Sequence, residues 1–512
     1  MAGNGLSRRS FLIGAAATGI SAALLSGDVS HEGYARLPPD VLKIRYSNNP
    51  VNQGAASTWS GSRDLVVTSR ICPPSYVSVL PIEGSISVVD KATNEQVAVQ
   101  KVFAKNADDY RVRAVFNGLD PNKHYRYEVR ADELGGQTFS GNTNSPLIRP
   151  ASESIYGRDR YVRLVFASCM EYTRGFWNSF TYMSERNPDA VFIIGDSIYA
   201  DVETRMFSGQ RPRKDPIPYA DDYELFLMKY LACNDSDRIR FLANSPGYFV
   251  PDDHEMRNNV IGTDRSERQV VDDGCRAYAK VYASANGADI NGFYRRVDFG
   301  QGTRVIVLDT RRFRDVDRGT MLGDKQLDWF KKELAAAKSD NVTRLMVVTS
   351  VSFVSGLERI TDSWAGFDRE RQHVIDEIAK LDLKNVTFVS GDLHTFYAGA
   401  VHLDPLNTKT DTVAYEFLGG AVSSKVGETG NTNGRVLANS KHSNGIMEMD
   451  VYDDGSMITT WWLYDAKKRD YVPTQGARFL NNPQSKYGPP PMSLQRADLS
   501  LIENPGQIPV LA

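Results

Sequence analysis

Short apolar stretches recur along the chain between residues 164 and 389, and they determine the kind of sheet that it can form. They span residues 164–167, 190–194, 304–308, 345–348 and 386–389. Near-continuous apolar runs of this length are typical of strands that are covered on both faces. Between the third and fourth stretch, Leu327, Phe330 and Leu334 share one side of a predicted helix that Asp324 can cap. Helices are therefore expected to cover the sheet.

Strand-like sequence returns near the C-terminus, at residues 445–451 and 457–463. Strands that come after the alternating strand and helix segments favour a mixed sheet, or two stacked sheets, over a purely parallel one. The expected fold class is α/β, with a core of mixed sheets flanked by helices over residues 160–465. Residues 466–512 are expected to form a C-terminal extension.

The region before this core has a different pattern, with short alternating runs broken by Gly, Pro and Asn. Polar and apolar residues alternate in 111–116 and again in 125–129, as in half-buried strands. Between them, residues 118–121 followed by Tyr125 resemble the tyrosine corner of fibronectin type III and related sandwiches, although a generic turn before a strand is the alternative. We predict an all-β sandwich over residues 40–148 with no chemistry of its own.

The N-terminus is typical of an export signal. A pair of arginines, Arg8 and Arg9, precedes Phe11 and Leu12 and an apolar run of about 15 residues, shorter than the roughly 20 that span a bilayer as a helix. This pattern resembles the twin-arginine signal, and a chance arginine pair in an ordinary secretory signal is the alternative. The expectations are a signal over residues 1–36, recognition by the twin-arginine export machinery, a periplasmic or secreted protein, and no stable transmembrane anchor.

Charge and cysteine content exclude two classes of protein. The chain carries 60 basic and 63 acidic residues, a net charge of -3, so it lacks the basic footprint of a nucleic-acid-binding protein. Its 4 cysteines are too few for a disulfide scaffold. Cys233 and Cys275 flank an acidic segment and could pair in an oxidising compartment, whereas Cys72 is expected to be a buried thiol.

Polar residues follow the C-terminal ends of the predicted strands, where open α/β sheets place their ligand sites. The segments are Ser168-Cys169, Gly195-Asp196-Ser197-Ile198-Tyr199, Asp252-Asp253-His254-Glu255 and Gly391-Asp392-Leu393-His394. Each has an ordinary interpretation as a turn, a core residue or an acidic helix start. Their order, each at a strand end, favours one shared site.

The residue types in these segments are metal ligands. Asp196 follows a glycine at a strand end and is placed to bridge two cations. Cys169 offers a thiolate and Tyr199 a phenolate, and together these donors indicate iron. Asp392 and His394 are two positions apart, so both can face one metal cluster from an extended segment.

The same succession of motifs resembles the PhoD-type alkaline phosphatase family over roughly residues 60–465. The resemblance rests on the four segments above together with Asn258-Asn259, Leu308-Asp309-Thr310-Arg311, Leu322-Gly323, Gln326, Trp329, Asp362-Ser363-Trp364 and Gly366. It implies a calcineurin-like metallophosphatase core that holds one Fe3+ ion and Ca2+ and hydrolyses phosphomonoesters and phosphodiesters. The preceding β-region and the twin-arginine signal also fit this family.

The resemblance also implies roles for individual residues. The iron ligands would be Cys169, Asp196, Tyr199 and His394, and the calcium ligands would be Asp196, Asp253, Asp362 and Asp392. Asn258 or Asn259 could replace Asp253 as a ligand. His254 would contact the phosphate or assist the leaving group. Met170, Ser197 and Pro251 depart from the residues common in the family, which affects the expected substrate preference rather than metal binding.

The expected reaction is attack of a metal-held hydroxide on phosphorus, in line with the leaving alcohol. Arg257 or Arg311 would offset the developing charge, unless these arginines form structural ion pairs. Two alternatives remain open. One is a phospholipase D-like phosphodiesterase on the same scaffold, and the other is an exported, non-catalytic binding protein that keeps the fold.

Overall fold

The computed structural model describes residues 51, 55–60, 63–74, 81–143, 161–174, 177, 179–201, 215, 217, 219–234, 236–283, 293–300, 302–354, 362–424, 436–440, 444–452, 455–465, 470–472 and 479–481. The predicted signal over residues 1–36, the connector at 149–160 and most of the predicted extension at 466–512 lie outside the described residues.

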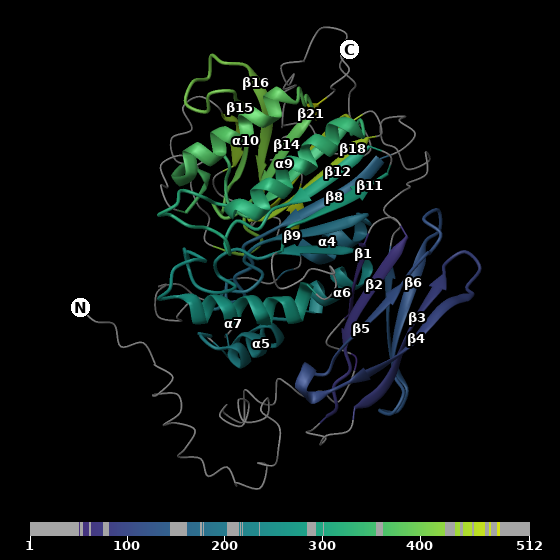
Figure 1. The fold of residues 1–512 in the computed structure, drawn as a ribbon. Helices are drawn as coiled ribbons and strands as arrows, with labels where there is room; N and C mark the ends of the chain where they lie inside the picture. Colours follow the sequence, from purple (N-terminus) through teal and green to yellow (C-terminus); the bar gives the residue numbers. More distant parts are fainter. Residues whose placement is uncertain are drawn as a thin grey trace.

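The N-terminal part is a sandwich of two antiparallel sheets, drawn in purple and blue in Figure 1. One sheet has the order β1 (Ala55–Ser60), β2 (Asp64–Arg70), β5 (Arg111–Phe116), and the other has the order β4 (Gln96–Ala104), β3 (Ile82–Asp90), β6 (Tyr125–Ala131), β7 (Gln137–Thr143). Trp59, Val67 and Tyr127 lie in the core between the sheets. The hydroxyl of Tyr125 donates to the carbonyl of Asp120 at 3.1 Å, which is the bond of a tyrosine corner. The predicted sandwich is confirmed.

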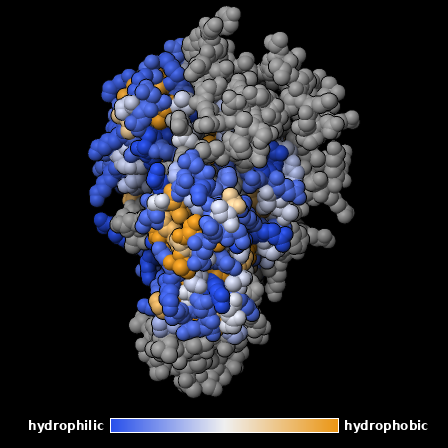
Figure 2. Space-filling model, turned by 90° about the vertical axis from the view of Figure 1, so that its right-hand side faces the viewer, coloured by the Kyte–Doolittle hydropathy of each residue, from blue (hydrophilic) through white to orange (hydrophobic). Residues whose placement is uncertain are grey.

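The outer side of this sandwich carries an exposed apolar row. Figure 2 views this side of the molecule and shows a hydrophobic patch among hydrophilic residues. On the edge strand β4, Val97, Val99 and Phe103 are exposed, and Lys101 lies in the same row and pairs with Glu83. A lysine within an exposed edge strand disfavours pairing with another strand.

In the larger part of the chain, the described residues form two mixed sheets of seven strands each. The first has the order β10 (Gly247–Val250), β9 (Ala190–Ile194), β8 (Tyr161–Ala167), β18 (Gly445–Tyr452), β19 (Met457–Asp465), β20 (Asp470–Val472), with β21 (Phe479–Asn481) also on β19. The second has the order β11 (Arg295–Phe299), β12 (Thr303–Val307), β13 (Arg344–Thr349), β14 (Val386–Ser390), β16 (Thr412–Leu418), β15 (Phe396–His402), β17 (Val436–Ser440).

Alternation along β12 and β13 shows how the layers pack. Val305 and Met346 join the core that contains the first sheet, whereas Ile306 and Val347 join a second core. That second core is closed by α9 (Gly323–Ser339) and α10 (Asp368–Lys380). The side of the first sheet carries α4 (Ser179–Glu185), α5 (Tyr223–Ala232), α6 (Ser236–Asn244) and α7 (Arg268–Tyr278). Two stacked sheets between helices therefore confirm the predicted fold class (Figure 1).

The start of α9 differs from the prediction. Its N-cap position is Leu322, and the side chain of Asp324 makes no cap but binds Arg318 at the surface. The backbone N–H of Leu322 donates instead to the carboxylate of Glu370 at 2.9 Å. A carboxylate from a neighbouring helix replaces the local cap because the end of α9 is buried against α10. The inward side chains of Phe330 and Leu334 are buried as predicted.

All four cysteines are buried, and no disulfide links them. Cys233 and Cys275 therefore do not pair, and the sulfur of Cys275 contacts that of Met256 at 3.6 Å. Cys72 lies in the sandwich core, as predicted. Within the described part of the chain, no helix is both long and apolar enough to cross a membrane.

Candidate metal centre

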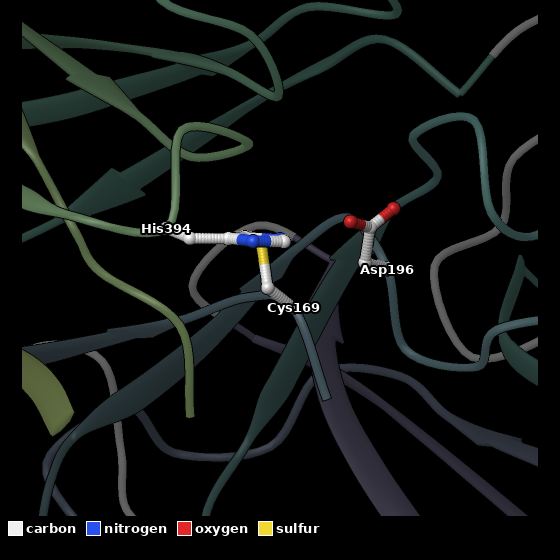
Figure 3. Close-up of side chains that lie close together, drawn as sticks. All are labelled: Cys169, Asp196 and His394. Atoms are coloured by element: carbon white, nitrogen blue, oxygen red, sulfur yellow. The ribbon is translucent and has the colours of Figure 1, made fainter. Parts of the chain in front are cut away.

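Three loops bring the predicted metal ligands together. Cys169 follows β8, Asp196 follows β9, and His394 lies between β14 and β15. Three ligand atoms lie within 4.8 Å of one another: the sulfur of Cys169, a carboxylate oxygen of Asp196 and a ring nitrogen of His394. Figure 3 shows the Cys169 and His394 side chains directed at each other, with the Asp196 carboxylate beside them.

Tyr199 completes this group. Its phenol oxygen lies 3.2 Å from Oδ2 of Asp196 and 3.1 Å from Nε2 of His394. The site thus combines a thiol, a carboxyl, a phenol and an imidazole. This is the donor set of a transition-metal site rather than of a calcium site, which would contain oxygen ligands alone.

The backbone at these ligands is held in an uncommon conformation. Cys169, Asp196, Asp392 and His394 have φ values of 56°, 53°, 70° and 54°. Residues with a Cβ adopt this left-handed region at a cost of roughly 1–3 kcal/mol each, and such residues cluster at functional sites. Gly195 precedes Asp196 with φ of 100°, and a Cβ there would lie only 2.4 Å from Cβ of Asp252. The turn therefore requires glycine.

Burial keeps the thiol and the phenol of this site protonated. Burial raises the pKa of Cys169 well above its ordinary value, and the carboxylate of Asp196 raises it further. The same two causes raise the pKa of Tyr199 well above its ordinary value. A bound cation reverses this balance because it favours the deprotonated thiolate and phenolate. The four donors therefore fit a bound metal ion.

A second group of donors shares Asp196. Oxygen atoms of Asp196 and Asp253 and a ring nitrogen of His254 lie within 4.8 Å of one another. Burial raises the pKa of Asp392 well above its ordinary value, and the carboxylates of Asp362 and Asp252 raise it further, so these acids lie in one buried cluster. Among the described residues, Asp362 and Asp392 belong to neither group of close donors, so Asp196, Asp253 and His254 alone form the second group.

Arg311 lies inside this acidic cluster and has no exposed side-chain area. Its guanidinium binds both carboxylate oxygens of Asp252 and donates to Asp362 at 2.6 Å, and it lies 3.8 Å from Asp253. Arg314 adds a weaker contact to Asp362 at 3.4 Å. Arg311 therefore organises the carboxylates, and its donors are directed at protein groups.

Arg257 occupies a different position. Its side chain is 38% exposed, donates to the hydroxyl of Tyr219 at 3.2 Å and lies 3.6 Å from Glu267. Asn258 and Asn259 follow it with exposed side chains, and their backbone N–H groups bind Asp201 and Asp253. These asparagines hold carboxylates in place through the backbone.

His254 is oriented by a residue that the sequence analysis did not select. Its Nδ1 lies 2.6 Å from Oδ1 of Asp201, and its ring stacks on Tyr199 with the centroids 4.1 Å apart. Burial lowers the pKa of His254, but the carboxylates of Asp253, Asp201 and Asp196 outweigh it and raise this pKa well above the ordinary value. Asp201 and Tyr199 therefore fix the orientation of the imidazole.

Two further carboxylates, from a segment already expected at the site, have roles that the sequence did not assign. Glu255 accepts the backbone N–H groups of Asp196, Ser197 and Asp252, and burial raises its pKa to about 7. Asp252 binds Arg311 and accepts the hydroxyl of Ser350 at 2.8 Å. Both stand in the acidic run at 252–255, so the run was a usable signal, but only spatial contacts separate supporting carboxylates from ligands.

Known proteins support the assignment that this geometry suggests. A sequence model of the PhoD-like phosphatase family matches residues 164–459, more than half of the chain. Alkaline phosphatase D of Bacillus subtilis is 24% identical over 426 residues, which cover 74% of this chain and 70% of that protein.

Two solved structures share the fold. A structure described as PhoD has a TM-score of 0.74 and 21% identity, covering 85% of this chain and 91% of that chain. A purple acid phosphatase from yellow lupin (Lupinus luteus) seeds has a TM-score of 0.56 and 13% identity, covering 82% of this chain and 72% of that chain. These two matches show a metallophosphatase-like fold. Together with the family match, they establish that the chain belongs to the PhoD-like phosphatase family and is a phosphoric ester hydrolase.

Proposed function

We propose that this hydrolase is an exported, metal-dependent alkaline phosphatase and phosphodiesterase that acts on small-molecule phosphate esters. The observation that carries the proposal is the meeting of Cys169, Asp196, Tyr199 and His394 from three separate loops. Cys169, Asp196 and Tyr199 are buried and His394 is partly buried, and all of them except Tyr199 have a left-handed backbone, which is common at functional sites. They are suited to a bound cation.

The donor types divide the site into two parts. Cys169, Asp196, Tyr199 and His394 would hold Fe3+, because thiolate, phenolate and imidazole suit a transition metal. Asp196, Asp253, Asp362 and Asp392 would hold Ca2+, which takes oxygen ligands. Asp196 would serve both ions, in agreement with its place in both groups of donors.

Bound cations would supply positive charge around the phosphoryl group and lower the pKa of water. The chain itself would supply orientation and protons. His254, held at Nδ1 by Asp201, would donate from Nε2 to a phosphate oxygen or to the leaving alcohol. Arg257, which is partly exposed, is better placed to meet a substrate phosphate than Arg311, whose guanidinium is enclosed by carboxylates. Arg311 would position Asp252 and Asp362.

Elemental analysis combined with chelation tests the metal requirement. Purified protein should contain iron and calcium, lose nitrophenyl phosphate hydrolysis after chelation, and regain it when both ions are returned. Cys169→Ala should abolish iron binding, whereas Cys233→Ala, which also removes a buried thiol, should keep the wild-type metal content. A metal-free protein with full activity would refute the proposal.

Export is proposed from the sequence alone. The pair Arg8-Arg9 before Phe11-Leu12 supports recognition by the twin-arginine machinery and a periplasmic or secreted location. Replacing both arginines with lysine should leave the protein inside the cell, as measured by fractionation. Export of the double-lysine variant at the wild-type level would exclude this route.

A further inference from the structure

We infer that Arg238 is a positioning residue that holds the metal-bearing turn after β9 and joins it to the helix on which the β-sandwich packs. The inference rests on the proposed function, because it concerns the turn that carries the shared ligand Asp196. None of the motifs in the sequence contains Arg238, which stands on α6.

The turn from Gly195 to Ser197 is fixed by hydrogen bonds to its backbone. The carbonyls of Gly195 and Asp196 accept the N–H groups of Cys169 and Met170 at 3.3 and 2.8 Å. The N–H groups of Asp196 and Ser197 donate to the carboxylate of Glu255. The carbonyl of Ser197 accepts a further bond, from Nη1 of Arg238 at 3.0 Å.

This bond is made by a guanidinium in an unusual environment. Arg238 is only 2% exposed, and among the described residues no carboxylate lies within ion-pair distance of it. Its second nitrogen donates to the hydroxyl of Tyr282, and its central carbon lies 5.4 Å from the Trp177 ring. Burying a charge without an ion pair is costly. A role in fixing the backbone of the turn at Ser197 would account for the burial of this charge.

The C-terminal end of α6 is attached to the β-sandwich. The hydroxyl of Tyr127 on β6 donates to the carbonyl of Ala243 at 2.9 Å, and the amide of Asn142 on β7 donates to Asn244 at 2.7 Å. Gly141 allows this close approach, because a Cβ there would lie 2.2 Å from the Ala243 carbonyl oxygen. Figure 1 shows α6 between the sandwich and the first sheet.

These contacts form a continuous connection from the sandwich through α6 and Arg238 to the turn that presents Asp196. A left-handed residue such as Asp196 persists only when its surroundings over-determine it. Loss of the Arg238 bond should therefore loosen the ligand and speed the loss of bound metal. The β-sandwich would then contribute to the metal site without touching it.

The test is the rate at which bound metal passes from the holoenzyme to an excess of chelator, followed by elemental analysis. Arg238→Gln should release metal about tenfold faster than wild type, the factor expected for loss of one hydrogen bond from a charged donor. Tyr127→Phe should accelerate release by a smaller factor. The control is Arg344→Lys. Arg344 is another buried arginine, and it donates to the carbonyl of Gly455. It lies at the start of β13, whereas Ser350, which binds Asp252 in the site, follows the end of that strand.

The outcomes separate the two proposals. Wild-type protein without metal would sink the proposed function and this inference together. If the wild-type protein holds metal and folded Arg238→Gln releases its metal at the wild-type rate, the inference alone is refuted. If circular dichroism shows that Arg238→Gln is unfolded, Arg238→Lys is judged by the same criterion. Wild-type release from Tyr127→Phe would overturn the link to the sandwich, and faster release from Arg344→Lys would show that any buried arginine has this effect.

Discussion

The phenol oxygen of Tyr199 lies 3.1 Å from Nε2 of His394, although 195 positions separate the two residues in the sequence. One follows a strand of the first sheet and the other follows a strand of the second. The contact therefore exists only because the two sheets pack face to face with their C-terminal strand ends at the same edge. It also places a phenol and an imidazole where one metal ion can bind both.

Tyr199→Phe should remove the colour of the iron-loaded protein. A phenolate bound to ferric iron absorbs visible light by charge transfer, and phenylalanine cannot bind the ion. The visible spectrum of the variant, recorded at matched iron content, provides the measurement. Tyr248→Phe, which alters another buried tyrosine that donates to the carbonyl of Trp59, should keep the band. An unchanged spectrum in Tyr199→Phe would remove this residue from the ligand set.

Asp201→Asn should lower kcat by about 10- to 100-fold and leave KM nearly unchanged, the range typical for groups that orient a functional histidine. The amide keeps the shape of the side chain but weakens the hold on Nδ1 of His254. Steady-state kinetics with a nitrophenyl phosphate measures both constants. Asp222→Asn serves as a control, because that carboxylate caps α5 and does not bind His254. Wild-type kcat in Asp201→Asn would show that His254 needs no such partner.

The two candidate arginines should respond differently to removal. Arg311→Ala leaves buried carboxylates without their cation and should cost about 3–5 kcal/mol in the free energy of unfolding. Arg257→Ala breaks partly exposed contacts, so its cost should stay below about 1 kcal/mol while KM rises. Denaturant unfolding and steady-state kinetics measure the two effects. A stable Arg311→Ala variant with a raised KM would reverse the assigned roles.

The cysteines should be inert in the folded protein. Burial raises the pKa of Cys275 to about 12, so its reactive thiolate is negligible at pH 8, far below that pKa. Titration with a thiol reagent at pH 8 should detect no thiol in the native holoenzyme and 4 after unfolding in chelator. Only two thiols after unfolding without reductant would instead indicate a Cys233–Cys275 disulfide.

Much of the fold follows from local sequence. Continuous apolar runs mark β9 and β14 because a strand buried on both faces has no polar side, and alternation marks β5 and β6 because each has one wet side. Polar residues directly after those runs identify the candidate ligands, because α/β sheets place their ligand sites at the C-terminal ends of strands. The prediction that Asp324 caps α9 was wrong, because the carboxylate that accepts the N–H of Leu322 belongs to Glu370 on another helix.

The sequence by itself determined the two regions, the strands of the core and the identity of the candidate ligands, because these depend on residue type and on periods of a few residues. The tertiary structure alone decided which charged residues support the candidate ligands. Asp201 orients His254, and Glu255 and Arg238 bind the turn at Asp196. Arg311 is enclosed by Asp252 and Asp362. The physical reason is that carboxylates are chemically alike, and only the packing of separate loops fixes which partner each one meets.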